Sequence, residues 1–141
     1  YIWKYVGLAL GLSNDELTDL ERDFWKGDKI NSGLVDYVRT HSVAYRPCIL
    51  SNAWPDARNL FDSITDLKIF EEIIISAEVG MAKPDSSIFL HACDQIGVAA
   101  SNAVFVDDMV ENVDAAIDLG MHGILFENTA QTLTDLNKLV G

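Results

Sequence analysis

The chain has 141 residues, the length of one ordinary domain, and acids outnumber bases 22 to 10, for a formal net charge of −12. A surface of that sign repels nucleic acid and anionic lipid, so we expect neither as a partner. No apolar run is long enough to span a bilayer and no basic-then-apolar leader is visible, so the sequence predicts a cytoplasmic protein. Cys48 and Cys93 lie within apolar patterns and are predicted to be reduced core residues.

The first part of the sequence reads as helical. Residues 1–12 form a very apolar pattern that ends near Gly11, and Ser13 with Glu16 forms a capping box that opens the next helix. A further helix is expected to start at Ser32, and nothing before Arg46 resembles a strand. We therefore predict a helical module over residues 1–43.

From Arg46 onward, strand and helix patterns alternate, which is typical of a parallel sheet with helices on both faces. Pro84 is expected in the first turn of one helix and Gly97 just past its end. The predicted strands cover residues 47–50, 73–75, 103–106 and 123–126, and the predicted helices cover 55–64, 84–96, about 108–119 and 132–139. The sequence thus predicts a Rossmann-like α/β domain over residues 44–141.

Two adjacent carboxylates, Asp107 and Asp108, end the third predicted strand. Acids at the end of a buried strand belong where the sheet opens to solvent, which in parallel sheets is the ligand-binding edge. Two neighbouring carboxylates repel each other unless a cation lies between them, and hard oxygen ligands favour Mg²⁺. An Asp helix cap would explain one of the two acids. Asn112 follows Asp108 by four residues, on the same helical face.

Two other strand ends carry polar residues. Ser51 and Asn52 follow the first strand, where a hydroxyl and an amide can bind a phosphoryl oxygen; the alternative is a helix cap. Lys83 stands just before a helix N-terminus, against the helix dipole, where it could neutralise a phosphoryl group; the alternative is an exposed loop lysine. Because parallel strands end at one edge, we expect Ser51, Lys83 and Asp108 to converge on one cleft.

Four stretches, Ile49–Asn52, Gly80–Asp85, Val106–Ala116 and Leu119–Gly120, resemble the haloacid dehalogenase-like hydrolase superfamily. The resemblance covers nearly the whole chain and is nearest to sugar-phosphate phosphatases and the phosphatase domain of soluble epoxide hydrolases, which carry a helical cap. Asn112 falls where some members have another acid. The opening helices resemble most of that cap, which selects the substrate. Candidate lining residues are Tyr1, Trp3, Tyr5, Phe24 and Trp25, and the alternative for each is packing of one helix on another.

The resemblance implies a role for each matching residue. Ser51, with Asn52 beside it, would contact the substrate phosphoryl group, and Lys83 would steady the charge of the nucleophile and the phosphoryl group. Asp108 would bind Mg²⁺ directly and Asp107 through a water molecule.

One family motif is absent from the sequence. The family's first strand ends in Asp-x-Asp, whose first Asp is the nucleophile and whose second is the general acid and base, and no apolar run before Ser51 ends that way. The acids found there occupy helical or turn contexts: Asp15, Asp19, Asp23, Asp28 and Asp36. We therefore expect an N-terminally incomplete chain without its central strand. The two inner strand edges, near 48–50 and 104–106, would then be unpaired and open to self-association.

Two classes of function follow from these observations. The first is a Mg²⁺-dependent phosphomonoesterase that acts on a small phosphorylated metabolite through an aspartyl-phosphate, with its nucleophile outside the given sequence. The second is a non-catalytic metal- or phosphate-binding, or interaction, module of the same fold. Signalling receiver domains combine similar residues, but their acid pair lies on the first strand, whereas here it follows Lys83 and Pro84.

Overall fold

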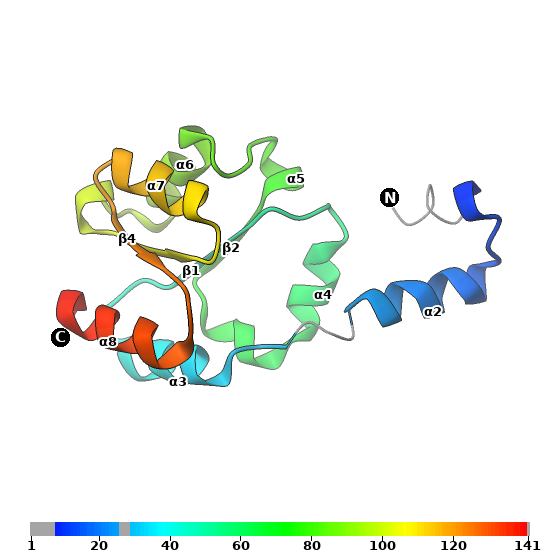
Figure 1. The fold of residues 1–141 in the computed structure, drawn as a ribbon, viewed down its shortest axis with the longest axis horizontal. Helices are drawn as coiled ribbons and strands as arrows, with labels where there is room; N and C mark the ends of the chain where they lie inside the picture. Colours follow the sequence, from blue (N-terminus) through cyan, green and yellow to red (C-terminus); the bar gives the residue numbers. More distant parts are fainter. Residues whose placement is uncertain (1–7, 26–28, 141) are drawn as a thin grey trace.

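Helices and short strands alternate along the chain in the computed structural model, which describes residues 8–25 and 29–140 (Figure 1). The elements in chain order are α2 (Asn14–Trp25), α3 (Ser32–His41), β1 (Cys48–Ser51), α4 (Ala57–Ser63), η1 (Thr65–Ile69), β2 (Glu72–Ile75), α5 (Ser76–Val79), α6 (Ser86–Ile96), η2 (Ala100–Asn102), β3 (Val104–Asp107), α7 (Val110–Asp118), β4 (His122–Leu125) and α8 (Thr129–Val140). The predicted α/β class is confirmed. Within the described ranges, no helix is long and apolar enough to cross a membrane.

The four strands form two separate parallel pairs. β1 pairs with β2, from Cys48 opposite Glu72 to Ser51 opposite Ile75, and β3 pairs with β4, from Val104 opposite His122 to Asp107 opposite Leu125. The predicted parallel pairing is confirmed. The four strands are not one continuous sheet, because β1 and β3 are not hydrogen-bonded to each other, and this gap agrees with the unpaired edges predicted near 48–50 and 104–106. The inner edges of these two strands are unpaired among the described residues.

The inner edge of β3 is identified by the bonds at its two ends. The carbonyls of Ala103 and Asp107 accept hydrogen bonds from the β4 side, from the N–H groups of His122 and Phe126 at 2.9 Å each. Successive residues of a strand direct their backbone groups to opposite edges, so Phe105 also faces β4. The backbone groups of Val104 and Val106 therefore face the unpaired inner edge.

An apolar cluster joins the two strand pairs. Ile74 of β2 and Phe105 of β3 both belong to it, together with Phe89 of α6. The Phe89 and Phe105 rings meet edge to face, with centroids 5.0 Å apart. The cluster is completed by Ile88, Ala92 and Ala116, with Cys48, Leu50, Val79, Met81, Ala115, Leu119 and Met121 partly buried against it. The strand pairs therefore share one core although no ladder bond connects them.

The two cysteines are free, as the sequence predicts. Cys93 of α6 is buried, and Cys48 of β1 is half-buried against the core cluster. Burial raises the pKa of the Cys48 thiol to about 11, with smaller contributions from the charges of Glu72 and Cys93. Both side chains therefore act as small apolar groups near neutral pH.

Helix ends follow the sequence in some places and differ in others. The capping box is confirmed: the Ser13 N–H donates to Glu16 Oε2 at 2.9 Å, and the Glu16 N–H donates to Ser13 Oγ at 3.3 Å. The expectation that Pro84 lies in the first turn of α6 is wrong, because Asp85 is the N-cap and its Oδ1 accepts from the Ser87 N–H at 2.8 Å. Gly97 ends α6 with φ +66°, as predicted. The short helix α5 was not anticipated.

The helices of residues 1–43 lie in different places. α3 lies beside α8 (Figure 1), where Asn31 Nδ2 donates to Thr129 Oγ1 at 2.8 Å and Tyr37 and Asn137 are hydrogen-bonded at 3.2 Å. α2 extends away from the strands in the same view. The predicted lining residues Tyr1, Trp3 and Tyr5 lie outside the described residues, as do the side chains of Phe24 and Trp25. The division into 1–43 and 44–141 stays a prediction.

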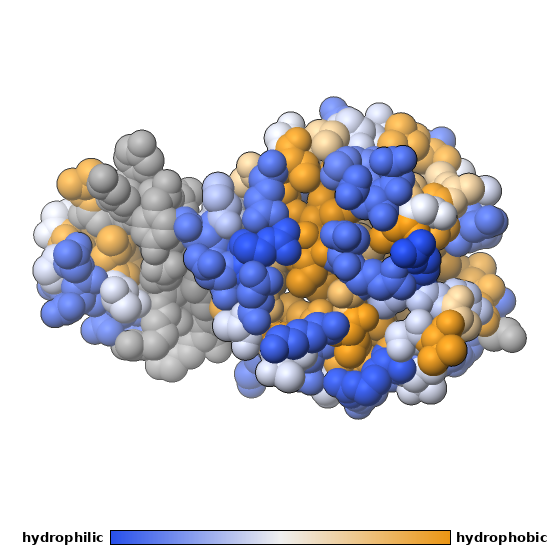
Figure 2. Space-filling model, turned by 180° about the vertical axis from the view of Figure 1, so that it is seen from behind, coloured by the Kyte–Doolittle hydropathy of each residue, from blue (hydrophilic) through white to orange (hydrophobic). Residues whose placement is uncertain are grey.

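Apolar surface remains on the α/β body. Figure 2 shows it between polar patches on the back of the molecule. Exposed apolar side chains of the body include Val110 at 55% and Leu90 at 51%. All four residues of β1 are only half-buried, whereas Ile74 and Ile75 of β2 are buried. β1, whose free edge faces the other strand pair, is thus less covered than β2.

Candidate functional site

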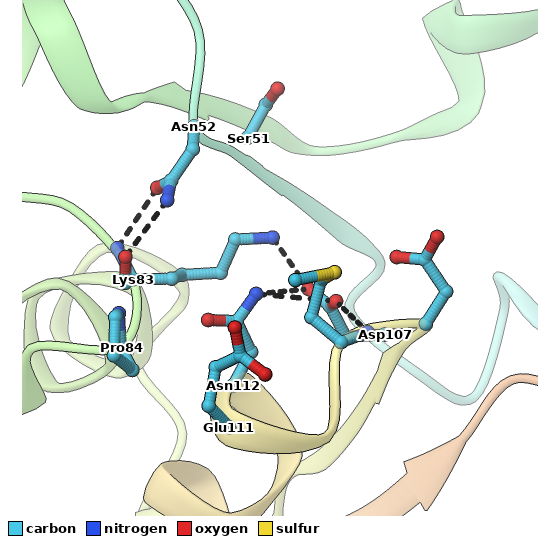
Figure 3. Close-up of a pocket in the computed structure, with 9 residues that line it drawn as sticks. Ser51, Asn52, Lys83, Pro84, Asp107, Glu111 and Asn112 are labelled. Atoms are coloured by element: carbon cyan, nitrogen blue, oxygen red, sulfur yellow. Dashed lines mark hydrogen bonds and ion pairs between the residues drawn. The ribbon is translucent and has the colours of Figure 1, made fainter.

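A polar cleft of about 350 Å³ lies where β1 and β3 end, at Ser51 and Asp107 (Figure 3). Its lining comprises Ser51, Asn52, Lys83, Pro84, Asp107, Asp108, Met109, Glu111 and Asn112. All six residues singled out from the sequence are in this list. The structure therefore brings together side chains that are far apart in the sequence, at the carboxyl ends of parallel strands.

A buried ion pair spans the cleft floor. Lys83 Nζ lies 2.6 Å from Asp107 Oδ2, and the two side chains are 11% and 6% exposed. The ammonium group also lies 5.6 Å from the centroid of the Phe105 ring. Lys83 comes from the loop after α5, so this contact connects that loop to the end of β3. The alternative of an exposed loop lysine does not describe this side chain.

Both oxygens of the Asp107 carboxylate are engaged by protein donors (Figure 3). Oδ1 accepts from the Met109 N–H at 2.8 Å, Oδ2 accepts from Lys83, and Asn112 Nδ2 lies 3.2 Å from each oxygen. Burial by itself raises the pKa of this carboxyl, but the hydrogen bonds from Lys83, Met109 and Asn112 outweigh it and lower the pKa. Asp107 is therefore a charged anchor for Lys83.

Asp108 contrasts with its neighbour. It is exposed and lines the cleft, as does Glu111 one helical turn later. An exposed carboxylate is a suitable ligand for Mg²⁺, which prefers oxygen donors in an octahedral arrangement. The described residues contain no group of three acids, histidines or cysteines that could hold a metal ion. Asp108 thus fits a metal site that needs further ligands.

Asn52 holds the loop that carries Lys83. Its Nδ2 donates to the Lys83 carbonyl at 2.8 Å, and its Oδ1 accepts from the Lys83 N–H at 2.9 Å (Figure 3). Both ends of the amide are therefore occupied by one backbone unit. Sequence reasoning placed Asn52 beside the phosphate, and the structure gives it a second task, the positioning of Lys83.

The Ser51 hydroxyl has no hydrogen-bond partner among the described residues, and it points away from Lys83 in Figure 3. The segment that follows Ser51 is fixed by Ser76, whose hydroxyl donates to the Ala53 carbonyl and accepts from the Ala53 N–H, both at 3.0 Å. From the sequence, Ser76 was only the end of a strand. Ser51 thus keeps a free hydroxyl on a fixed backbone.

Two lining residues, Met109 and Glu111, were not identified from the sequence. Both follow the acid pair at the start of α7, and Met109 is 47% exposed. Spacing could have indicated Glu111, which follows Asp108 by three residues at the predicted start of a helix, whereas nothing in the sequence marks Met109. The apolar and acidic residues after the pair are thus part of the same surface.

The comparisons with protein families and with known proteins agree on one family. The model of the haloacid dehalogenase-like hydrolase family matches residues 6–120. The chain is 34% identical over 102 residues to a bifunctional epoxide hydrolase 2 of Mus musculus, an alignment that covers 69% of this chain and 18% of that protein. It is 38% identical over 87 residues to a sesquiterpene phosphatase of Aspergillus oryzae, covering 62% of this chain and 44% of that protein.

Solved structures share the fold. A predicted HAD-like family hydrolase from Porphyromonas gingivalis superposes with a TM-score of 0.75 at 24% identity, covering 96% of this chain and 71% of that one. A mutant HAD family enzyme from Bacteroides thetaiotaomicron, in complex with magnesium and inorganic phosphate, gives a TM-score of 0.70 at 22% identity, covering 85% and 65%. The chain spans less than half the length of the two curated relatives above.

Proposed function

Because the chain belongs to the haloacid dehalogenase-like hydrolase family, we propose that it forms part of a Mg²⁺-dependent phosphomonoesterase that acts on a small phosphorylated metabolite. The observation that carries the proposal is the cleft itself, where the free Ser51 hydroxyl, the Lys83–Asp107 ion pair and the exposed Asp108 meet. The phosphatase relative from Aspergillus oryzae and the magnesium–phosphate complex of the neighbour from Bacteroides thetaiotaomicron support this choice of chemistry.

Each residue has a proposed role. The Ser51 hydroxyl donates to a phosphoryl oxygen, and Lys83, held in place by Asp107 and Asn52, faces the negative charge that the transferring group carries. Asp108 would hold the metal ion directly. Bound Mg²⁺ would supply further positive charge against the phosphoryl oxygens. Asn112 orients the Asp107 carboxylate, because its Nδ2 lies 3.2 Å from each carboxylate oxygen.

The nucleophile and the acid–base group are proposed to lie outside these 141 residues, on a strand that pairs with the inner edges of β1 and β3. A carboxylate oxygen of that strand attacks phosphorus, the ester P–O bond breaks, and the alcohol leaves with a proton from a second carboxyl group. Water then hydrolyses the aspartyl-phosphate and releases inorganic phosphate. The unpaired inner edges support this placement, and without the strand we propose that they make the chain self-associate.

The helical region before β1 is proposed to contain part of a substrate-selecting cap. Since α3 is hydrogen-bonded to α8 of the α/β body, we propose that the cap belongs to the residues before Asn31 and that α3 acts as a support for the body. The predicted boundary near residue 43 would then lie too late in the chain. Limited proteolysis that cuts between α2 and α3, and leaves α3 attached to the body, would support the earlier boundary.

The test compares two polypeptides in a p-nitrophenyl phosphate assay with Mg²⁺. The 141-residue chain should show no turnover, and a polypeptide extended through its upstream coding sequence should be active if that sequence ends a strand in Asp-x-Asp. In the extended protein, Asp108→Asn should abolish activity, and Asp114→Asn, which removes an exposed charge from α7 outside the cleft, should not. Turnover by the 141 residues alone, abolished by changing one of their acids, would show that the nucleophile was misplaced.

A non-catalytic metal- or phosphate-binding module is the second candidate. It is favoured because the described residues contain no group of three His, Cys, Asp or Glu side chains that could hold a metal ion. An upstream sequence without an acidic strand end, together with retained phosphate binding, would establish this candidate in place of the enzyme.

A further inference from the structure

We propose that Glu111 and Met109 determine the substrate class of the cleft: a phosphomonoester whose remaining part is uncharged and apolar. This inference rests on the proposed function. It depends on two features of the lining, the balance of charges and the apolar side chain of Met109 just before α7.

Among the residues that the structure describes, the cleft has no cation to spare for a second anionic group. Lys83 is the one basic residue among the described residues of the lining, and its charge is matched by that of Asp107, with Nζ and Oδ2 2.6 Å apart. Two carboxylates, Asp108 and Glu111, remain. A divalent ion beside Asp108 would offset that carboxylate and leave one net positive charge for the substrate phosphate, while the charge of Glu111 stays uncompensated. A carboxylate or second phosphate on the substrate would face Glu111.

Other basic side chains do not compensate, because most of those that the structure describes are paired elsewhere. Arg39 bonds Asp36 and Asp66, Arg46 bonds Glu71, Arg58 bonds Glu78 and Lys138 bonds Asp135. None of these bases lines the cleft. The exclusion of a second anion therefore rests on Glu111, which lines the same cleft as Lys83 and Asp107 (Figure 3).

The start of α7 adds apolar surface at the same place. Met109 lines the cleft and is 47% exposed, and its neighbour Val110 is 55% exposed. The Met109 backbone is fixed, because its N–H donates to Asp107 Oδ1 at 2.8 Å. A methionine side chain adapts to irregular apolar shapes, so it is suited to cover an alkyl group attached to the bound phosphate.

The test measures binding to the 141-residue chain by NMR titration with excess Mg²⁺, a method that detects millimolar affinities. The probes are inorganic phosphate, propyl phosphate, hexyl phosphate and 2-carboxyethyl phosphate, in which a carboxylate replaces the terminal methyl of the propyl group. We expect propyl phosphate to bind about fivefold more tightly than its carboxylate analogue, from one like-charge repulsion at the cleft. Hexyl phosphate should bind about tenfold more tightly than propyl phosphate, because three more methylenes are partly buried.

Matched variants test whether Glu111 causes the preference against the carboxylate and whether Met109 causes the preference for the longer alkyl chain. Glu111→Gln should bring the fivefold ratio close to one, whereas Asp114→Asn, the same charge change outside the lining, should leave it in place. Met109→Ser should reduce the hexyl preference to about threefold, and Met109→Leu should restore it.

The outcomes separate the two levels of the proposal. If inorganic phosphate does not bind, the proposed phosphate site fails and this inference fails with it. If inorganic phosphate binds but the two ratios are near one, or do not respond to the Glu111 and Met109 variants, the phosphate site stands and the proposed substrate class is wrong.

Discussion

The β1–β2 half of the body and the β3–β4 half are built alike but contribute different chemistry. Each is a parallel pair of four-residue strands. The first half brings neutral polar groups to the cleft, Ser51 and Asn52, and the second brings the acids Asp107 and Asp108. Lys83, from the loop after the first half, bonds an acid of the second. The halves are thus connected by side chains, through the ion pair at the cleft and the core cluster below it.

The core cluster makes the larger contribution to this connection. Phe89 is fully buried and contacts Phe105 across the two halves, so Phe89→Ala should lower the free energy of unfolding by about 4 kcal/mol. Urea denaturation at low micromolar protein concentration measures the loss. Phe89→Leu, which keeps most of the volume, should cost clearly less. A loss below about 1 kcal/mol for the alanine variant would show that the halves are held together by other contacts.

Loss of the Lys83–Asp107 ion pair should cause the next largest decrease in the free energy of unfolding. Asp107→Ala leaves the Lys83 ammonium buried without its partner, which should cost about 3 kcal/mol of stability. Asp107→Asn keeps an acceptor and should cost less. Because its hydrogen bonds lower the pKa of Asp107, the carboxylate stabilises the fold above its unfolded pKa of about 4 and loses this effect as pH falls through the folded value.

The pH dependence supplies the control for this effect. The stability difference between the native chain and Asp107→Asn should be constant from pH 5 to 7 and should shrink below pH 4. A difference that stays constant down to pH 2 would contradict the assignment of Asp107 as a charged anchor.

The two halves also show what the sequence could and could not predict. Apolar runs ended by polar residues identified the strands, and parallel topology then placed Ser51, Lys83 and Asp108 at one cleft. The pairing of Lys83 with Asp107 rather than with a ligand depends on side-chain geometry that spacing does not encode. The start of α6 was misplaced because Pro84 favours a first turn, while the Asp85 cap bond decided the boundary. Glu111 and Met109 lacked a distinctive motif.

The smallest expected effect is a difference in amide hydrogen-exchange rate between residues of one strand, β3. The N–H groups of Val104 and Val106 face the unpaired inner edge, and that of Phe105 faces β4. In native-state hydrogen exchange of the dilute chain, Val104 and Val106 should therefore exchange at least about tenfold faster than Phe105. Raising the protein concentration should slow Val104 and Val106 selectively if the edges pair between molecules, and the strand of an extended polypeptide should slow them at any concentration. Equal protection of all three amides in the dilute chain would show that the inner edge of β3 already has a partner, and that the two halves are closed by more than side chains.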